Sequence, residues 1–266
     1  GISEFEIQTT EVTYRQLVSI FNWALEQQKA EFVSNLEGQD VALRMASLDS
    51  EGEKRKLMRL PTSGGEIFQS ENSALIFADG FADLPARDLT WYGAMAYSHW
   101  LNQRDGVSSA VDIQDWTIDL SQPGFRPPTE AEWEKAARGG LVGKIFPWGD
   151  VINTDRANYN RSYIRDTLST IVSPAGSYPA NGYGLYDMAG NVAEWVYDKW
   201  AGYPEYDEVV YDPTGPSQDF TQHYRVKRGG SFGGDPSRQT VFDRDSSPPS
   251  SWGYADVGFR PVRSLP

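Results

Sequence analysis

The chain has 266 residues, a net charge of −13 at pH 7 and no cysteine. The acidic balance argues against a nucleic-acid-binding protein, because such a protein needs a basic face to displace counterions from phosphates. The absence of thiols excludes disulfides, cysteine nucleophiles and thiolate-bound metals within this chain.

The first predicted elements are a short strand and a helix. Residues 5–7 alternate apolar and charged side chains, as a half-buried strand does. Thr13 and Gln16 match a capping box, in which two side chains satisfy free backbone amides at a helix start. An apolar stripe at helical spacing follows, formed by Leu17, Ile20, Phe21 and Ala24. We therefore expect a helix that packs this stripe into the core.

Two further helices are predicted before residue 140. The second begins after Thr90, shows apolar residues at helical spacing, and stops at the Asp-Gly pair of residues 105–106. The third is marked by Thr129 and Glu132, which form another capping box directly after two prolines. It is expected to end at the Gly-Gly pair of residues 139–140.

The rest of the chain predicts short strands and loops. Residues 39–82 carry short strands and turns, and the part after residue 140 is rich in Gly, Pro, Asn and aromatic residues. Neither a linker nor an internal repeat is visible. We therefore predict an α+β protein that forms a single domain over residues 1–266.

Four segments together resemble the formylglycine-generating enzyme family, also called the sulfatase-modifying-factor domain. They are residues 124–140, 146–149, 181–195, and 225–231 with 257–260. The resemblance covers nearly the whole chain, in the order that the family shows. It implies a C-type-lectin-like fold, with a small core and much irregular loop.

The residues of these segments also have physical interpretations. Close backbone approach or a positive φ is expected at Gly139, Gly140, Gly229 and Gly230. Core positions are expected for Trp133, Trp148 and Trp195. Half-buried pairing with carboxylates such as Glu130, Glu132 or Glu194 is expected for Arg126, Arg228, Arg244 and Arg260.

The resemblance also shows what the chain lacks. Enzymes of the family carry two cysteines near the Gly-Gly-Ser segment, which bind copper and drive the oxidation of a substrate cysteine. The equivalent positions here are Gly234 and Gln239, and neither supplies the soft sulfur that copper(I) prefers. We therefore expect no copper cofactor and lean against an enzyme.

Other catalytic arrangements are weakly supported. His99 and His223 are far apart in the sequence, with no motif that pairs them, and Ser231 has no recognisable base partner. Some family members without the thiols act in siderophore or peptide maturation. A thiol-free, oxidoreductase-like enzyme therefore remains the alternative hypothesis.

The segment 231–256 predicts a binding surface. It mixes small polar residues with isolated aromatic ones, as antibody paratopes do; an ordinary solvated loop is the alternative. It also resembles the C-terminal variable region of proteins of this fold that are diversified by retroelements. The resemblance implies contact residues Phe232, Asp235, Ser237, Arg238, Thr240, Phe242, Asp243, Asp245, Ser246, Ser247, Trp252 and Tyr254. Arg238, Trp252 and Tyr254 are the expected anchors, since Arg, Trp and Tyr are frequent hot spots.

The resemblance further implies a structural calcium ion. One site would use side-chain oxygens of Asp187 and Glu194 and backbone carbonyls of Gly190 and Val192. A second site would involve Asn158, Tyr159 and Asp166. The alternative for Glu194 is that it simply pairs with an arginine.

The leading hypothesis is a non-catalytic ligand-binding protein that is diversified and displayed outside the cell. The expected partner is a protein or another surface ligand, and no nucleic acid is expected. No apolar run approaches the roughly 18–20 residues that a membrane-spanning helix needs. No export signal is visible either.

Overall fold

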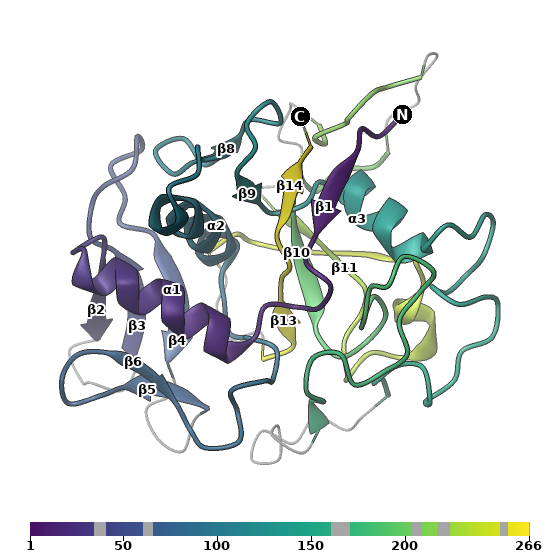
Figure 1. The fold of residues 1–266 in the computed structure, drawn as a ribbon, viewed down its shortest axis with the longest axis horizontal. Helices are drawn as coiled ribbons and strands as arrows, with labels where there is room; N and C mark the ends of the chain where they lie inside the picture. Colours follow the sequence, from purple (N-terminus) through teal and green to yellow (C-terminus); the bar gives the residue numbers. More distant parts are fainter. Residues whose placement is uncertain are drawn as a thin grey trace.

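The fold is given by a computed structural model. It describes residues 1–34, 41–60, 66–160, 171–203, 209–216, 224–250 and 255–265. Strands from both ends of the chain meet near the centre, helices α1 and α2 lie to one side, and long loops with α3 lie to the other (Figure 1). In these ranges we find no helix with the length and apolar character of a membrane span.

Helix α1 (Tyr14–Glu26) forms where the capping box predicts it. The Thr13 hydroxyl accepts from the Gln16 amide, and the Gln16 side chain accepts from the Thr13 amide. The predicted apolar stripe is fully buried. This stripe packs α1 against α2 (Figure 1).

Helices α2 (Trp91–Asp105) and α3 (Glu130–Arg138) also follow their sequence signals. Thr90 caps α2, and Thr129 forms a capping box with Glu132 at the start of α3. Each helix ends at a glycine in the left-handed conformation, where a side chain would be strained. All three predicted helices are thus confirmed.

Small antiparallel sheets cover the helical side of the molecule. One has three strands in the order β2-β3-β4, and two are hairpins, β5-β6 and β7-β8. Their bounds are β2 Ala30–Ser34, β3 Val41–Met45, β4 Lys56–Leu60, β5 Ile67–Gln69, β6 Leu75–Phe77, β7 Val111–Asp112 and β8 Thr117–Ile118.

Two central sheets tie distant parts of the chain together. A three-stranded sheet has the order β1-β14-β9, which joins the N-terminal strand to the C-terminal one (Figure 1). A four-stranded sheet has the order β12-β11-β10-β13, in which β10 and β13 are parallel. The bounds are β1 Phe5–Ile7, β9 Phe125–Arg126, β10 Ala193–Lys199, β11 Arg225–Arg228, β12 Arg244–Ser247, β13 Val257–Gly258 and β14 Val262–Ser264. A 3₁₀ helix spans Pro236–Gln239.

The core is rich in tryptophan. Trp133 and Trp195 are fully buried, as predicted, and so are Trp91 and Trp100. The prediction for Trp148 is wrong. Its ring is only partly buried, stacks on Phe146 at a centroid distance of 5.8 Å, and donates its indole N–H to a loop carbonyl.

The glycine pairs adopt positive φ angles, as predicted. The values are 55° and 86° at Gly139 and Gly140, and 91° and 67° at Gly229 and Gly230. A Cβ at Gly229 would lie 3.1 Å from the ring of Trp133. Gly229 therefore lets the backbone pass close to this core side chain.

The arginines pair with carboxylates, but three of them lie deeper than predicted. Arg126, Arg228 and Arg260 are fully buried, and only Arg244 is half-buried. Arg126 forms a two-bond pair with Glu132, with both N–O distances 2.7 Å. Such planar, two-point pairing offsets much of the cost of removing both charges from water.

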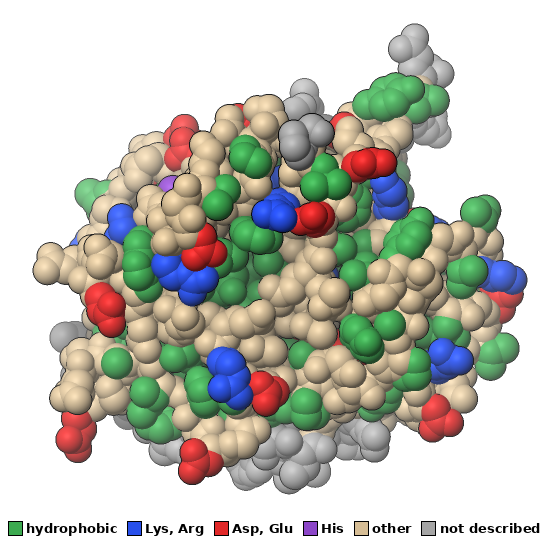
Figure 2. Space-filling model, viewed as in Figure 1, with side chains coloured by type: hydrophobic (Ala, Val, Ile, Leu, Met, Phe, Trp, Pro, Cys, Tyr) green, Lys and Arg blue, Asp and Glu red, His purple; other side chains and the backbone are tan. Residues whose placement is uncertain are grey.

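The face of the molecule seen in Figure 2 carries charges of both signs. On the face drawn in Figure 2, Lys, Arg, Asp and Glu side chains are scattered between polar and apolar ones. No continuous basic area is visible on that face.

Candidate functional site

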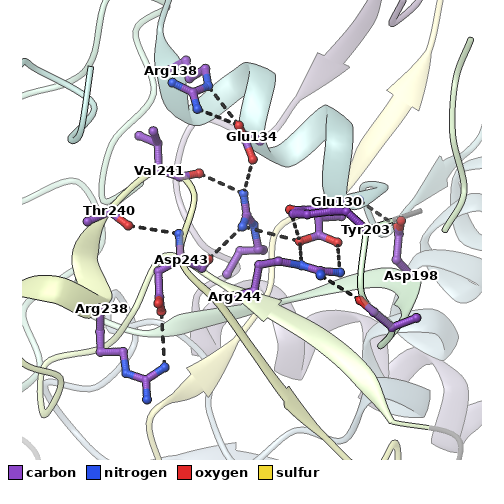
Figure 3. A network of polar contacts seen from close by, with 12 residues as sticks. Glu130, Glu134, Arg138, Asp198, Tyr203, Arg238, Thr240, Val241, Asp243 and Arg244 are labelled. Carbon is purple, nitrogen blue, oxygen red and sulfur yellow. Dashed lines mark hydrogen bonds and ion pairs between the residues drawn. The ribbon is translucent and has the colours of Figure 1, made fainter. Parts of the chain in front are cut away.

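A network of ion pairs joins helix α3 to strands β11 and β12 (Figure 3). Glu130 accepts two bonds from the guanidinium of Arg244, at 2.6 and 2.7 Å. Glu134, one turn later on α3, accepts from Arg228 at 2.6 Å and from Arg138 at 2.7 Å. The spacing of four residues places both carboxylates on the same face of the helix. The network fixes this face against the sheet.

Aromatic rings enclose Arg244 within this network. Its guanidinium carbon lies 4.0 Å from the ring centroid of Tyr203 and 4.8 Å from that of Trp200. The Tyr203 hydroxyl donates to Glu130 at 3.2 Å, and partial burial beside that carboxylate raises the pKa of Tyr203 to about 12. Tyr203 therefore stays protonated and serves as a hydrogen-bond donor.

A pocket of about 680 Å³ opens over the network. Its floor includes Glu130 and Arg244, and its walls come from α3, from the loops after α3 and β10, and from the loop before β12. The main apolar wall residues are Leu141, Val142, Tyr183, Tyr203, Pro216 and Phe242. A concave, mostly apolar pocket with a few polar groups is the usual form of a small-ligand site. We call it the α3 pocket.

Asp198 is the second carboxylate beneath the α3 pocket. It is the last buried residue of β10 and lines the pocket. One of its oxygens accepts a hydrogen bond from the Glu130 amide at 2.7 Å. Burial, together with the nearby Glu130 and Glu132, raises the pKa of Asp198 to about 7. Its charge therefore changes near neutral pH.

The predicted contact residues of segment 231–256 divide by exposure. Asp235, Ser237, Arg238, Phe242 and Asp245 are exposed, and Asp243 and Ser246 are partly buried. Arg238 lies 3.6 Å from the Asp243 carboxylate. Among the exposed residues of this group, Phe242 is the one that lines the α3 pocket. Trp252 and Tyr254 lie outside the described residues.

Three predicted contact residues are buried, which corrects the sequence interpretation. Phe232 is fully buried against Val172 and Val192. Thr240 and Ser247 are also buried. They hold the segment in place and offer a ligand no direct contact. Sequence alone could not separate them from their exposed neighbours, because the loop has no regular period.

The residues predicted to bind calcium lie around one buried polar cluster. One Asp187 oxygen accepts the Gly176 amide at 2.6 Å, and its other oxygen is buried beside the Glu11 carboxyl and accepts no N–H. The side-chain oxygen of Asn158 is likewise buried and accepts no N–H. The Asn158 carbonyl accepts the Asn191 amide at 2.8 Å, next to Gly190, so the two predicted sites adjoin.

Glu194 is fully engaged in this cluster. It accepts bonds from Arg260 at 2.7, 2.8 and 3.0 Å and from the Trp133 indole at 2.7 Å. Asp187 and Asn158 therefore carry the buried oxygens without an N–H donor that would suit a hard cation, whereas Glu194 pairs with an arginine. In the described part of the chain, no three His, Asp or Glu side chains converge as a metal site.

The remaining predicted calcium residues contribute less. Val192 and Tyr159 are buried, and Asp166 lies outside the described residues. Sequence reasoning missed Glu11, which is fully buried with one unpaired oxygen. Burial and the charge of Asp187 raise the pKa of Glu11 well above its usual value. No sequence pattern could have predicted that Glu11 lies beside Asp187, because the two residues are far apart in the chain.

Comparisons with known proteins show the family of the chain. Residues 1–265 match the model of the sulfatase-modifying factor enzyme 1-like domain. The chain belongs to this family. It is 38% identical over 162 residues to the serine/threonine-protein kinase pkn1 of Chlamydia pneumoniae, covering 61% of this chain and 21% of the kinase. It is 32% identical over 156 residues to the mouse formylglycine-generating enzyme, covering 56% of this chain and 35% of the enzyme.

Solved structures show the same fold. Treponema denticola variable protein 1 matches with a TM-score of 0.61 and 23% identity, covering 89% of this chain and 95% of that one. CarF matches with a TM-score of 0.64 and 20% identity, covering 98% and 87%. The predicted C-type-lectin-like fold of the formylglycine-generating-enzyme type is confirmed. The chain spans about a fifth of the kinases that it matches.

Gly234 and Gln239, the positions at which the family resemblance places the two cysteines, lie next to each other. The Gln239 side chain is fully buried, and its amide nitrogen donates to the carbonyls of Ser231 and Asp235, both at 3.2 Å. A Cβ at Gly234 would lie 2.7 Å from that nitrogen. Gln239 therefore fills the space that thiols would use.

The other residues considered for catalysis are structural or not described. The Ser231 hydroxyl donates to Asp256 at 2.8 Å and is buried. The His99 ring contacts Ser109 and the Val111 carbonyl, and burial lowers its pKa. His223 lies outside the described residues. The sequence missed Asp198, although alternation along β10 places it on the same face as Glu194.

Proposed function

We propose that this protein binds a ligand without transforming it, and that the α3 pocket is the site. The observation that carries the proposal is the pocket of about 680 Å³, with apolar walls over a fixed polar floor. The family's thiol positions are closed by Gln239, which supports a role other than thiol chemistry. Phe242 brings segment 231–256 into the pocket wall, so changes in that segment would alter what binds.

The proposal is tested with Phe242→Ala and 3-phenylpropanol, a neutral apolar probe. We expect the variant to bind the probe about three- to tenfold more weakly, because about 1 kcal/mol of apolar contact is lost. An NMR titration would follow amide shifts of α3 and residues 201–203. Phe68→Ala is the matched control, because Phe68 is also exposed but lies in β5 away from the pocket. Equal effects of both variants, or no binding, would refute the site.

Diversification and display outside the cell are part of the same proposal. The fold similarity to Treponema denticola variable protein 1 supports them as a hypothesis. A reverse transcriptase gene, with an imperfect copy of the segment encoding residues 231–260, is expected near the coding region. If the genome has neither the gene nor the copy, the diversification hypothesis is refuted and the ligand-binding proposal is unaffected.

A thiol-free enzyme is the second candidate. It is favoured by Asp198, whose pKa of about 7 beside Glu130 suits acid–base chemistry. Mass spectrometry of a cysteine-containing peptide incubated with the protein, oxygen and copper would test the family reaction. Conversion of the cysteine to formylglycine would overturn the non-catalytic proposal.

We also propose a structural calcium ion bound by Asp187 and Asn158. Their buried oxygens that accept no N–H support it, and a cation there would also separate the adjoining carboxyls of Asp187 and Glu11. Millimolar calcium chloride is expected to raise the melting temperature, because a ligand at 100 times its Kd adds about 2.7 kcal/mol to stability. Asp187→Asn should remove most of this rise, whereas Asp119→Asn, at an exposed turn, should not. An unchanged melting temperature on adding calcium would contradict the proposal.

A further inference from the structure

We propose that the α3 pocket selects a ligand that joins an apolar body to a protonated amine, with the amine paired to Asp198. This inference rests on the proposed binding function and adds the chemical class of the ligand. It follows from the partners of every charged group that lines the pocket.

The cations of the pocket already have partners. Arg244 donates to Glu130 and to the Ala201 carbonyl, and Arg138 donates to Glu134. Lys135 donates to the backbone carbonyls of residues 2 and 3, at 3.1 and 3.3 Å. At Arg244 and Arg138 a ligand anion would therefore compete with a carboxylate, whereas Lys135, whose partners are neutral carbonyls, is the one lining cation in the described residues without an acidic partner.

Two of the three acids are paired as well. Glu130 is bound by Arg244, Arg228 and the Tyr203 hydroxyl, and Glu134 by Arg138 and Arg228. In Figure 3 these groups form one connected set, with Asp198 at its margin.

Asp198 is the remaining acid, and Arg225 and Arg244 act on its charge without forming a salt bridge with it. Its side chain is buried, with 4% of the residue exposed, and no salt bridge joins it to a Lys or Arg in the described ranges. One oxygen accepts the Glu130 amide, and the other lies next to Gly215 in the pocket lining. A buried carboxylate without a salt bridge is costly, so an entering amine would supply a directly paired charge.

The walls of the pocket suit the rest of such a ligand. Tyr183, Tyr203 and Phe242 are exposed and line the opening. Their rings offer apolar contact to a hydrocarbon body and attract a cation that passes over their faces. The net charge of −13 on the whole chain adds long-range attraction for a cationic ligand.

Several titratable groups around Asp198 set the pH at which the amine would bind. Glu130 and Glu132 on α3 raise the pKa of Asp198, Arg225 on β11 lowers it, and burial dominates to place it at about 7. Tyr203 and Arg244 keep their charge states near this pH, because both pKa values are raised. Amine binding should therefore weaken as the pH falls through about 7, because protonated Asp198 no longer attracts it.

The test compares 3-phenylpropylamine, 3-phenylpropanol and 3-phenylpropionate by NMR titration at pH 8. We expect the amine to bind about ten- to a hundredfold more tightly than the alcohol, as a charge-assisted hydrogen bond of 1.5–3 kcal/mol allows. The propionate should bind most weakly. Asp198→Asn should abolish the preference for the amine over the alcohol. Asparagine keeps an oxygen for the Glu130 amide, so a purely structural role of Asp198 would leave the preference intact.

The outcomes separate this inference from the binding function. Equal binding of amine and alcohol, or an amine preference that survives in Asp198→Asn, would overturn the inference and leave the pocket as a site. Failure of all three probes to shift α3 resonances would overturn both. A preference that disappears at pH 5.5 in the wild type, together with its loss in the variant, would support the inference.

Discussion

Arg260→Met is expected to lower the free energy of unfolding by about 3–5 kcal/mol, the range for breaking a buried ion pair. Arg260 is fully buried, and its guanidinium bonds to Glu194 at 2.7–3.0 Å. It also donates to the carbonyls of Gln8, Thr9 and Tyr186. One side chain thus joins the N-terminal segment, the middle of the chain and the C-terminal segment. Methionine would keep most of the volume but leave the Glu194 charge buried and uncompensated.

The measurement is urea unfolding followed by tryptophan fluorescence. Arg15→Met is the matched control, because Arg15 pairs with Asp83 at the exposed surface. Exposed pairs of this kind contribute about 0–1 kcal/mol. In the double variant Arg260→Met with Glu194→Gln, part of the loss should be recovered because no buried charge is left unpaired. Similar unfolding midpoints for Arg260→Met and Arg15→Met would show that the buried pair does not hold the three segments together.

The double variant Gly234→Cys with Gln239→Cys is expected to bind copper(I) at a site that the wild type is expected to lack. Residues 234 and 239 are close, since a Cβ at the first lies 2.7 Å from the side-chain nitrogen of the second. Gly234 has no positive φ, so a cysteine is compatible with its backbone. Two thiolates are the soft ligands that copper(I) prefers. Titration against a coloured copper(I) chelator should show about one copper bound per chain.

The single variants provide the control for this prediction. Gly234→Cys alone places a side chain against the buried Gln239 amide and should cost about 1–3 kcal/mol, as overpacking does. Gln239→Cys removes that clash, so the double variant should be more stable than Gly234→Cys alone. If the double variant binds no more copper than the wild type, the two positions do not form the family's thiol pair in this chain.

The local structure of the helices could be predicted from the sequence. Thr13, Thr129 and the glycines after α2 and α3 act on backbone groups within a few residues of themselves, so their signals are complete in the local sequence. The apolar stripe of α1 likewise marks its buried face. The ordered family segments predicted the overall fold, which the match over residues 1–265 confirms.

The depth of each side chain was less predictable. The arginines were expected to pair with acids, and they do, but the burial of Arg260 depends on strands from both ends of the chain. Phe232 and Phe242 stand in the same loop with similar neighbours, yet one is buried and the other lines the pocket. No local rule separates them, because an irregular loop has no repeating direction for its side chains.

The sequence by itself thus determined the helix boundaries, the fold and the loss of the copper-binding thiols. Only the tertiary structure decided where a ligand could bind. The α3 pocket takes Glu130 from a helix, Asp198 from β10 and Arg244 from β12, which are far apart in the chain. Whether such a charge is paired depends on these distant partners. Asp198 stands out because the cations that line the pocket, Arg138, Arg244 and Lys135, bond to other groups.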